Sequence, residues 1–510
     1  MAGSSTKFLA EIPEEDWAKT PESVKKLVAI LVEQIAAGER QIAALQEGQD
    51  HLQEQVQRNS RNSSQPPSQD ASKGLKAKPK KKSVKPRGAQ LGHEGHQQEL
   101  YPPEQCEDIK DYYPAQCCEC GQELSGEDAA PQRCQVVEIP PLRAIVIEHR
   151  FHALTCPCCG VTTRAYDREI VDGSRYGERL CALVGVLSGE YRQSHRMVVR
   201  LLAEIFAIEM SVGSVGRLRQ EISASVAEPV VQAHGYVQRQ AQVGIDETSF
   251  QQGNADGQNP TGKKGWLWVV VTPLVCYFQV LLSRSQAAAQ EILGTPFSGS
   301  VNSDRYSAYT WLSIEQRQLC WAHLKRDFTK MAERSGVSRE LGEALLQQQE
   351  QLFERWHRLR DGTLSRSQLI LEVAPIRQRL QELLTEGASY PIANGEKTPL
   401  AKTVRTCQQL LKVEPALWLF VTVEGLEPTN NAAEQAIRPA VLWRRCSYGS
   451  QSAAGSLFVG RMMTVVTSLR RQKQNVLDYL TAACRAKRQG QMAPSLLPLS
   501  SLVDEALAVS

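Results

Sequence analysis

The chain has 510 residues, of which 42% are hydrophobic and 23% are charged, and its formal net charge is +3. This length leaves room for roughly two to four domains, and the composition is that of an ordinary soluble protein. No apolar run reaches the about 18 residues that a membrane span requires, and the first residues lack the pattern of a secretory signal. We therefore expect a cytoplasmic protein without a membrane partner.

Residues 20–58 are predicted to form a long helix with one apolar stripe. Ten positions from Val24 to Val56 follow alternating steps of four and three residues, and eight of them are apolar. This spacing is typical of a heptad seam, which predicts a coiled coil that joins the chain into a homodimer or higher oligomer. Gly38 and Gln49 interrupt the seam, and the alternative is a single amphipathic helix that packs on its own protein.

Residues 59–100 are polar and are predicted to form a flexible linker. Between Lys73 and Arg87 this linker carries eight Lys or Arg residues and no acid. Such a block stays solvated, so it is either a solubilising segment or an arm that contacts DNA phosphates and releases counterions. The candidate DNA contacts in the arm are three consecutive lysines, Lys80, Lys81 and Lys82.

Residues 101–170 hold eight of the fourteen cysteines. Two Cys-x-x-Cys pairs, each followed by glycine, begin at Cys117 and Cys156, and this pattern predicts a structural zinc site. Its four candidate ligands are Cys117, Cys120, Cys156 and Cys159. A third cysteine inside each pair leaves the choice of ligands open, and buried thiols without metal are the alternative. Alternating apolar residues from 134 to 151 predict a hairpin between the two pairs.

Residues 175–230 are predicted to be helical, with a helix, a short turn and a second helix between residues 194 and 222. Ser211 is positioned to cap the second helix, which carries Arg217 and Arg219. A helix-turn-helix places its second helix in the major groove of DNA, so both arginines are candidate DNA contacts. Many helical hairpins bind nothing, and a purely structural role is the alternative.

Residues 240–322 are predicted to form an α/β region. Four strands are expected, near 242–246, 266–271, 276–282 and 299–303. Asp246 and Asp304 come at the ends of the first and the last of these strands. A sheet fixes the backbone of such a carboxylate while its side chain faces a cleft, so both acids are well placed for chemistry.

Helices are predicted for the rest of the chain. Residues 323–424 are rich in helix formers such as Leu, Gln, Glu and Arg, and residues 425–485 are predicted to be helical again. In the second stretch Asn430 and Asn431 precede Glu434, which is the pattern of a capped helix start with the acid on the first turn.

Three acids from two strands and one helix suit a two-metal site for phosphoryl transfer, in which two Mg²⁺ or Mn²⁺ ions flank the reacting phosphate. The candidate catalytic residues and metal ligands are Asp246, Asp304 and Glu434. The pattern alone does not separate them from the other acids, and Glu247, Glu424 and Glu427 compete with them. Strand alternation puts Glu247 on the face opposite to Asp246, and the other two competitors lack the Asn-Asn helix start.

Four short motifs follow one another along the chain. They are GIDET at 244–248, NSDRYSAY at 302–309, CWAHLKR at 320–326 and NNAAEQAIRP at 430–439. In this order they resemble the insertion sequence 66 family of bacterial DDE transposases. The cysteine module is similar to that family too, and so is the linker, with its glycine- and histidine-containing segment 87–95.

The resemblance implies a fold like that of ribonuclease H, a mixed five-stranded sheet with flanking helices. Asp246 would end the first strand, Asp304 the fourth, and Glu434 would lie on the helix that closes the site. The chain would then be a multidomain α/β protein whose catalytic core is interrupted by a helical insertion at 323–424. The two parts of that core are residues 240–322 and 425–485.

The resemblance also implies an activity: metal-dependent cleavage of double-stranded DNA at the ends of an insertion sequence, followed by strand transfer into a target. Such a protein is expected to be associated with the nucleoid, and some elements of the family encode small accessory proteins. Two other functions stay open, a zinc-dependent DNA-binding protein with a decayed core and a Mg²⁺-dependent nuclease that does not join strands. The presence of all three acids in their motifs argues against decay.

Further candidate DNA-binding residues are basic: His323, Arg326, Arg438, Arg444 and Arg445. The first two lie directly after the second acid motif, where an arginine fork suits the geometry of a scissile phosphate. Their alternative is packing around the end of a strand. The other three are expected to form a basic face toward the DNA backbone, or else a solvated helix face.

Overall fold

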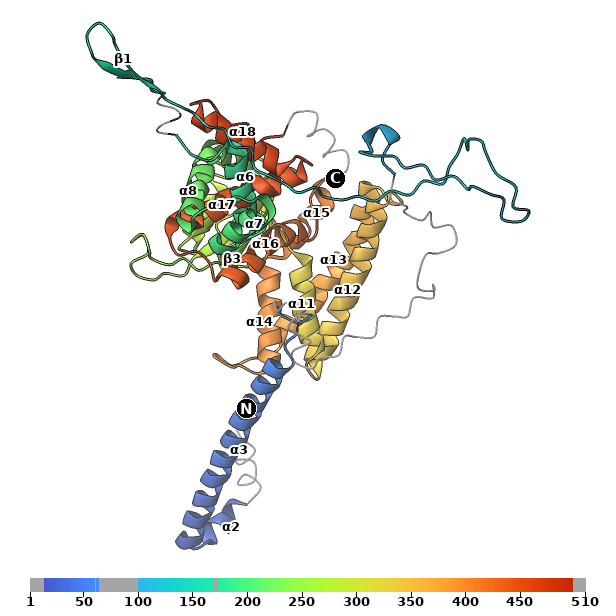
Figure 1. Cartoon of the computed structure of the whole chain (residues 1–510). Helices are drawn as coiled ribbons and strands as arrows, with labels where there is room; N and C mark the ends of the chain where they lie inside the picture. Colours follow the sequence, from blue (N-terminus) through green and yellow to red (C-terminus); the bar gives the residue numbers. More distant parts are fainter. Residues whose placement is uncertain (1–12, 60, 64–99, 168–169, 171–172, 499–510) are drawn as a thin grey trace. The chain divides into compact units, whose positions relative to one another are not determined.

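The computed structural model describes residues 13–59, 61–63, 100–167, 170 and 173–498 (Figure 1). The chain forms two compact units. The larger comprises Met1–Leu75, Tyr166–Val198 and Ser211–Ser510, and the smaller Lys76–Ala165 and Val199–Met210. Within the residues that the structure describes, no helix is long and apolar enough to cross a membrane.

The larger unit contains a five-stranded mixed sheet. Its strands are β3 (Gln242–Ser249), β4 (Trp266–Val271), β5 (Cys276–Leu281), β6 (Ser300–Ser303) and β7 (Arg317–Leu319). Their order across the sheet is β5-β4-β3-β6-β7, with β3, β4 and β5 antiparallel and with β6 and β7 running parallel to β3. The first four lie where the sequence predicts strands. The fifth has three residues, too few for a periodic pattern to reveal it.

The composition of β4 explains its place inside the sheet. Its sequence Trp-Leu-Trp-Val-Val-Val is aromatic and β-branched, and all but Trp266 are buried. Side chains of this kind fit a pleated surface, and a continuous apolar run is typical of a strand covered on both faces. Helix α16 (Asn431–Ser447) packs against β3 and β4, and helix α17 (Ala453–Arg471) packs against β5.

Helix α17 also supplies partners for the outer edge of the sheet. The hydroxyl of Ser468 accepts a hydrogen bond from the backbone N–H of Cys276 at 3.0 Å, and that of Thr464 accepts one from Phe278 at 2.9 Å. A buried N–H group on an unpaired edge needs such a partner. Gly460 allows the close approach, because a Cβ there would lie 2.9 Å from the carbonyl oxygen of Phe278.

A helical segment follows β7. It consists of α11 (Trp321–Ala332), α12 (Val337–Arg360), α13 (Arg366–Ser389), α14 (Pro399–Lys412) and α15 (Leu419–Thr422). Successive long helices pack on one another (Figure 1) around a shared apolar core in which Trp356 meets Phe420 at 5.2 Å between ring centroids. The predicted insertion is therefore helical. The apolar core of the insertion also includes Leu319 of β7 and Trp321, so this core begins before residue 323 and includes the end of the sheet.

Further helices precede the sheet, connect two of its strands or follow it. They are α6 (Glu178–Gly189), α7 (His195–Phe206), α8 (Val212–Ser225), α9 (Ala227–Val237), α10 (Gln286–Leu293) and α18 (Val476–Arg488). Short 3-10 turns lie at η2 (Ser307–Tyr309), η3 (Ile314–Gln316) and η4 (Glu414–Leu417). Ser211 caps α8 as predicted, because its hydroxyl accepts a hydrogen bond from the N–H of Ser214 at 3.0 Å. Helices α6, α8 and α18 pack against one another, so segments before and after the sheet meet.

The N-terminal residues form α2 (Glu14–Lys19) and the 35-residue helix α3 (Glu22–Val56). The long predicted helix is thus present. Most of its apolar stripe is exposed to solvent, from Val24 at 42% to Val56 at 75%, and Val28 is half-buried. The choice between a coiled coil and packing on its own chain stays a prediction.

The smaller unit contains η1 (Pro103–Gln105) and an antiparallel hairpin of β1 (Ala153–Thr155) and β2 (Thr162–Arg164), together with most of helix α7. The hairpin predicted within residues 134–151 is wrong, because that stretch carries no strand and its apolar side chains are exposed. Pro140 and Pro141 stand in its middle, and proline has no N–H to donate to a ladder.

Candidate active site

Asp246 lies on β3, in the interior of the sheet. It pairs with Val269 of β4, and the strand continues for three residues beyond it to Ser249. The expectation that Asp246 ends its strand is therefore wrong: the polar residues that follow it remain paired with β4. The Asp246 carboxylate accepts a hydrogen bond from the N–H of Glu247 at 2.9 Å.

The second acid follows β6 directly. Strand β6 runs parallel to β3, with Gly244 opposite Asn302. Two residues further along each strand direction, the same register brings Asp304 beside Asp246. The Asp304 carboxylate accepts a hydrogen bond from the N–H of Tyr306 at 2.8 Å, which holds it at the strand end. The fourth-strand position expected for Asp304 thus agrees with the structure.

The third acid, Glu434, lies on the first turn of α16. The residue before this helix, Asn430, makes no side-chain cap, which corrects the capped start expected from the sequence. Its amide instead donates a hydrogen bond to the carbonyl oxygen of Ile245 at 2.7 Å. The start of α16 is therefore fastened to β3 next to Asp246. Gly244 is required there, because a Cβ would lie 2.8 Å from the Asn430 amide oxygen.

A second asparagine fastens the same region from the neighbouring strand. The amide of Asn302 on β6 donates to the carbonyl oxygens of Glu427 at 2.7 Å and Thr429 at 3.1 Å. Both asparagines stand inside the motifs quoted above, but no local pattern indicates that they join strand to helix. Together they hold Glu434 over the strands that carry the two aspartates.

Electrostatics indicate that the three acids share one site. The pKa of Asp246 is raised well above its ordinary value, first by burial and then by the charges of Glu247, Asp304 and Glu434. Like charges that are close together disfavour one another's ionised forms. Within the described residues the trio does not form a group whose ligand atoms all lie within 4.8 Å of one another.

Glu247, the competitor of Asp246, is bound by two side chains of its own. Arg284 donates to one of its carboxylate oxygens at 2.6 Å, and the phenol of Tyr309 donates to the other. Burial is the main cause that raises the pKa of Glu247. This acid is thus engaged inside the protein. The side chains of the other two competitors, Glu424 and Glu427, are exposed.

Two residues of α11 face the third acid. His323 Nδ1 lies 3.6 Å from Glu434 Oε1, and Arg326 Nη2 lies 3.8 Å from Glu434 Oε2. Burial lowers the pKa of His323; Glu434 opposes this shift and Arg326 adds to it. The imidazole is therefore neutral near pH 7. Cys320, close to both His323 and Glu434, accepts a hydrogen bond from the N–H of Asn430 at 3.2 Å.

A polar cavity of about 320 Å³ opens at this point. Its lining includes Asp304, His323 and Arg326, together with further basic side chains, Arg284, Arg305 and Lys330. The cavity thus places one of the three acids at the wall of a basic pocket, which is the arrangement that an anionic substrate needs.

Of the basic residues of α16, one is bound to the sheet and two are exposed to solvent. Arg444 donates to the carbonyl oxygen of Ser249 at 2.8 Å, so its guanidinium is bound to the end of β3. Arg438 and Arg445 are exposed. Arg444 and Arg445 also line an open groove of about 600 Å³ with Lys264.

The two arginines of α8 differ from each other. Arg217 is exposed, as a DNA contact requires. Arg219 instead lies 4.1 Å from the centre of the Phe458 ring and contacts His195, and burial lowers its pKa to about 10. Its side chain is directed into the protein, so the sequence-based placement of Arg219 on the outer face is corrected.

Each Cys-x-x-Cys pair forms the same tight turn. The N–H of Gly121 donates to the carbonyl oxygen of Cys117 at 2.9 Å, and that of Gly160 to Cys156 at 2.9 Å. Both glycines have positive φ, +76° and +73°, which explains their place in the motif. Backbone N–H groups inside the turns are the main cause that lowers the pKa of Cys117 and of Cys156.

The four predicted zinc ligands are not gathered in the described residues. No group that combines Cys117, Cys120, Cys156 and Cys159 has its sulfur atoms within 4.8 Å of one another. The local geometry of each knuckle is thus formed, and the pairing of the two knuckles is not. The lysines expected to contact DNA, Lys80, Lys81 and Lys82, lie outside the described residues.

Comparisons with known proteins find two family models. The model described as "Transposase IS66 family" matches residues 173–457, which include all three acids, and a model of a family of unknown function matches residues 13–99. The chain is also 26% identical over 445 residues to the uncharacterized protein y4qI of Sinorhizobium fredii (strain NBRC 101917 / NGR234), a match that covers 82% of this chain and 77% of that protein.

Proposed function

Because the chain belongs to the transposase IS66 family, we propose that it binds the ends of an insertion sequence, cleaves the DNA there and joins the freed end to a target. The observation that carries this proposal is the convergence of Asp246, Asp304 and Glu434. Each comes from a different element, and the last two raise the pKa of the first. The alternatives, a decayed DNA-binding protein and a nuclease without joining, are outcomes of the experiment below.

The three acids suit a pair of Mg²⁺ or Mn²⁺ ions. Oxygen-rich carboxylate sites favour such hard cations. Glu434 Oε1 has no hydrogen-bond partner, and Asp246 lies among like charges, so a cation would find uncompensated negative charge at both. When bound, two ions activate the attacking oxygen and stabilise the leaving oxygen.

The chain's own residues would orient the reaction. Asn430 and Asn302 hold α16 against β3 and β6, which keeps Glu434 in place while DNA binds. Arg326 and neutral His323 face the cavity beside Asp304 and would donate hydrogen bonds to oxygens of the scissile phosphate. We infer that water first hydrolyses the phosphodiester at the element end. The freed 3′-hydroxyl then attacks target DNA in line, displacing one target strand end.

Several wider features belong to the same proposal. The strand order and directions support a ribonuclease H-like core. The exposed seam of α3 supports a coiled coil that pairs protomers, so that two element ends are held together. The knuckles at Cys117 and Cys156 support a zinc module that forms when the two turns meet around one ion. Double-stranded DNA as the partner would place the protein at the nucleoid in the cytoplasm.

The proposal is tested by incubating the purified full chain with DNA fragments from either side of its own gene, a target plasmid and Mg²⁺. We expect nicks at fixed positions in the end fragments, followed by joined products between those ends and the plasmid. Cleavage without joined products would support the nuclease instead. Binding without either reaction would support the decayed DNA-binding protein.

Arg217 and Arg219 give a matched test of the DNA-binding face. Replacing exposed Arg217 by alanine is expected to weaken binding to end DNA and to lower the slope of log K against log salt by about one phosphate contact. Replacing Arg219 is expected to leave that slope unchanged and to lower thermal stability, because its guanidinium packs on Phe458. Filter binding across a salt series measures both. Equal slopes for Arg217→Ala and the unaltered protein would remove α8 from the DNA interface.

A further inference from the structure

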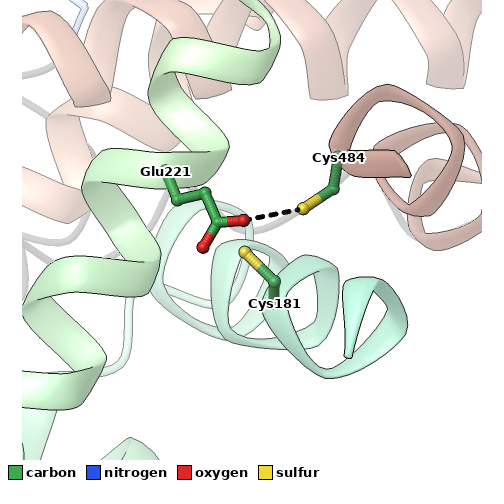
Figure 2. A group of neighbouring side chains, drawn as sticks. All are labelled: Cys181, Glu221 and Cys484. Atoms are coloured by element: carbon green, nitrogen blue, oxygen red, sulfur yellow. Dashed lines mark hydrogen bonds between the residues drawn. The ribbon is translucent and has the colours of Figure 1, made fainter. Parts of the chain in front are cut away.

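Two buried thiols and a carboxylate lie close together on helices outside the four sequence motifs (Figure 2). Cys181 comes from α6, Glu221 from α8 and Cys484 from α18, and one ligand atom of each lies within 4.8 Å of those of the other two. Both cysteines are 0% exposed. Figure 2 shows the three side chains pointing toward a common centre between the helices.

The surroundings of this cluster are polar, which is unusual for buried cysteines. The Cys484 thiol donates to Glu221 Oε1 at 3.5 Å, and Arg488 Nε donates to the same oxygen at 2.7 Å. Arg488 also reaches Glu178 Oε1 at 3.2 Å. A backbone oxygen faces the cluster too, because the Cys181 sulfur lies 3.6 Å from the carbonyl oxygen of Leu218.

Two buried cysteines elsewhere in the described part of the same unit have no such group of metal-ligand side chains around them. Cys276 and Cys407 are 0% exposed, and neither belongs to a group of ligand-type side chains among the described residues. They act as small apolar side chains, which is the common role of a buried free cysteine. The cluster differs from these apolar sites, because its two buried thiols share their surroundings with a half-buried carboxylate and an arginine.

We propose that Cys181, Cys484 and Glu221 form a binding site for one thiolate-preferring divalent cation, of which Zn²⁺ is the typical case. Two thiolates and a carboxylate supply three of the four ligands of a tetrahedral zinc site. Arg488 would act on the carboxylate as an outer partner that fixes its orientation.

The charge balance of the site is compatible with one divalent cation. Binding one divalent cation would release the two thiol protons to solvent, so the net charge buried between the helices is the same before and after binding. The site differs from the predicted knuckles, which lie in the smaller unit and contribute none of its ligands. It also does not depend on the proposed transposase activity.

Such a site would fasten distant parts of the chain to one another. Glu221 and Cys484 are 263 positions apart, and they join the helices before the sheet to the helix after it. Because the folded state presents the three ligands and the unfolded state does not, the binding free energy adds to the stability of the larger unit.

The test is the zinc content of the full chain, measured by inductively coupled plasma mass spectrometry after expression with zinc and removal of loose metal. Cys181→Ser and Cys484→Ser should each lose one zinc ion per chain relative to the unaltered protein. The control Cys276→Ser removes an equally buried thiol of the same unit and should lose none. Because only differences are compared, zinc held by the knuckles does not affect the result.

A variant that keeps both thiols guards against misfolding of the serine variants. Glu221→Gln should release one zinc ion per chain to a chelator faster than the unaltered protein does, while its circular dichroism spectrum stays the same. Equal zinc content in all four variants and in the unaltered protein would overturn the proposal. A disulfide between Cys181 and Cys484, found by peptide mapping without reductant in protein that carries no zinc at this site, would overturn it as well.

Discussion

Replacing Asp246 by asparagine is expected to abolish cleavage and joining while leaving the affinity for end DNA unchanged. The substitution keeps the shape of the side chain and removes the charge that would hold the metal ions. Loss of metal assistance is worth several kcal/mol, and about 4 kcal/mol corresponds to a thousandfold lower rate. We expect at least this decrease in the nicking of end fragments. Because the basic surfaces stay intact, gel-shift titration should give the same dissociation constant.

The matched control for Asp246→Asn is Glu427→Gln. Glu427 competes for the third acid position in the sequence, but its side chain is exposed and only its backbone oxygen contributes, as an acceptor for Asn302. The control should cleave and join at the rate of the unaltered protein. If Asp246→Asn still produced joined DNA, Asp246 would have no part in the chemistry. If Glu427→Gln lost both reactions, the third acid would have to be reassigned.

The parts of this site that could be predicted from the sequence are those that depend on local pattern. Strand β3 around Asp246 shows the alternate burial that period-two sequence patterns record, and the short strand before Asp304 is a buried run. The tight turns at Cys117 and Cys156 are equally local, because a glycine with positive φ follows each pair at a fixed distance. Hydrogen bonds within a few residues therefore lie where the pattern predicts them.

The parts that could not be predicted depend on partners far along the chain. Asn430 has the sequence of a cap, yet it bonds to Ile245, 185 positions away, because the start of α16 is buried against β3. Arg219 lies on the helix face predicted to meet DNA, yet it packs on Phe458. In both cases a side chain has two physically sound partners, and only the tertiary arrangement decides between them.

The proposed metal site also predicts how stability depends on pH. The pKa of Asp246 in the folded protein is raised above its unfolded value of about 3.9. A carboxyl shifted in this direction stabilises the fold below the unfolded pKa, and this contribution is lost as the pH rises through the folded pKa. In the presence of EDTA, Asp246→Asn should therefore melt at a higher temperature than the unaltered protein. The difference should grow with pH and level off once Asp246 is ionised.

Added Mg²⁺ or Mn²⁺ should reverse this order. The ions bind the folded state only, so they raise the melting temperature of the unaltered protein, on the order of 2–4 °C for each kcal/mol, and act weakly on Asp246→Asn. Differential scanning calorimetry between pH 4 and pH 8, with and without metal, measures both effects, and Glu427→Gln should follow the unaltered protein throughout. An Asp246→Asn variant that melts at the same temperature as the unaltered protein at every pH in EDTA would mean that the three acids do not repel one another. The site would then lack the uncompensated negative charge that attracts two cations, and the assignment of the trio as metal ligands would fail independently of any DNA substrate.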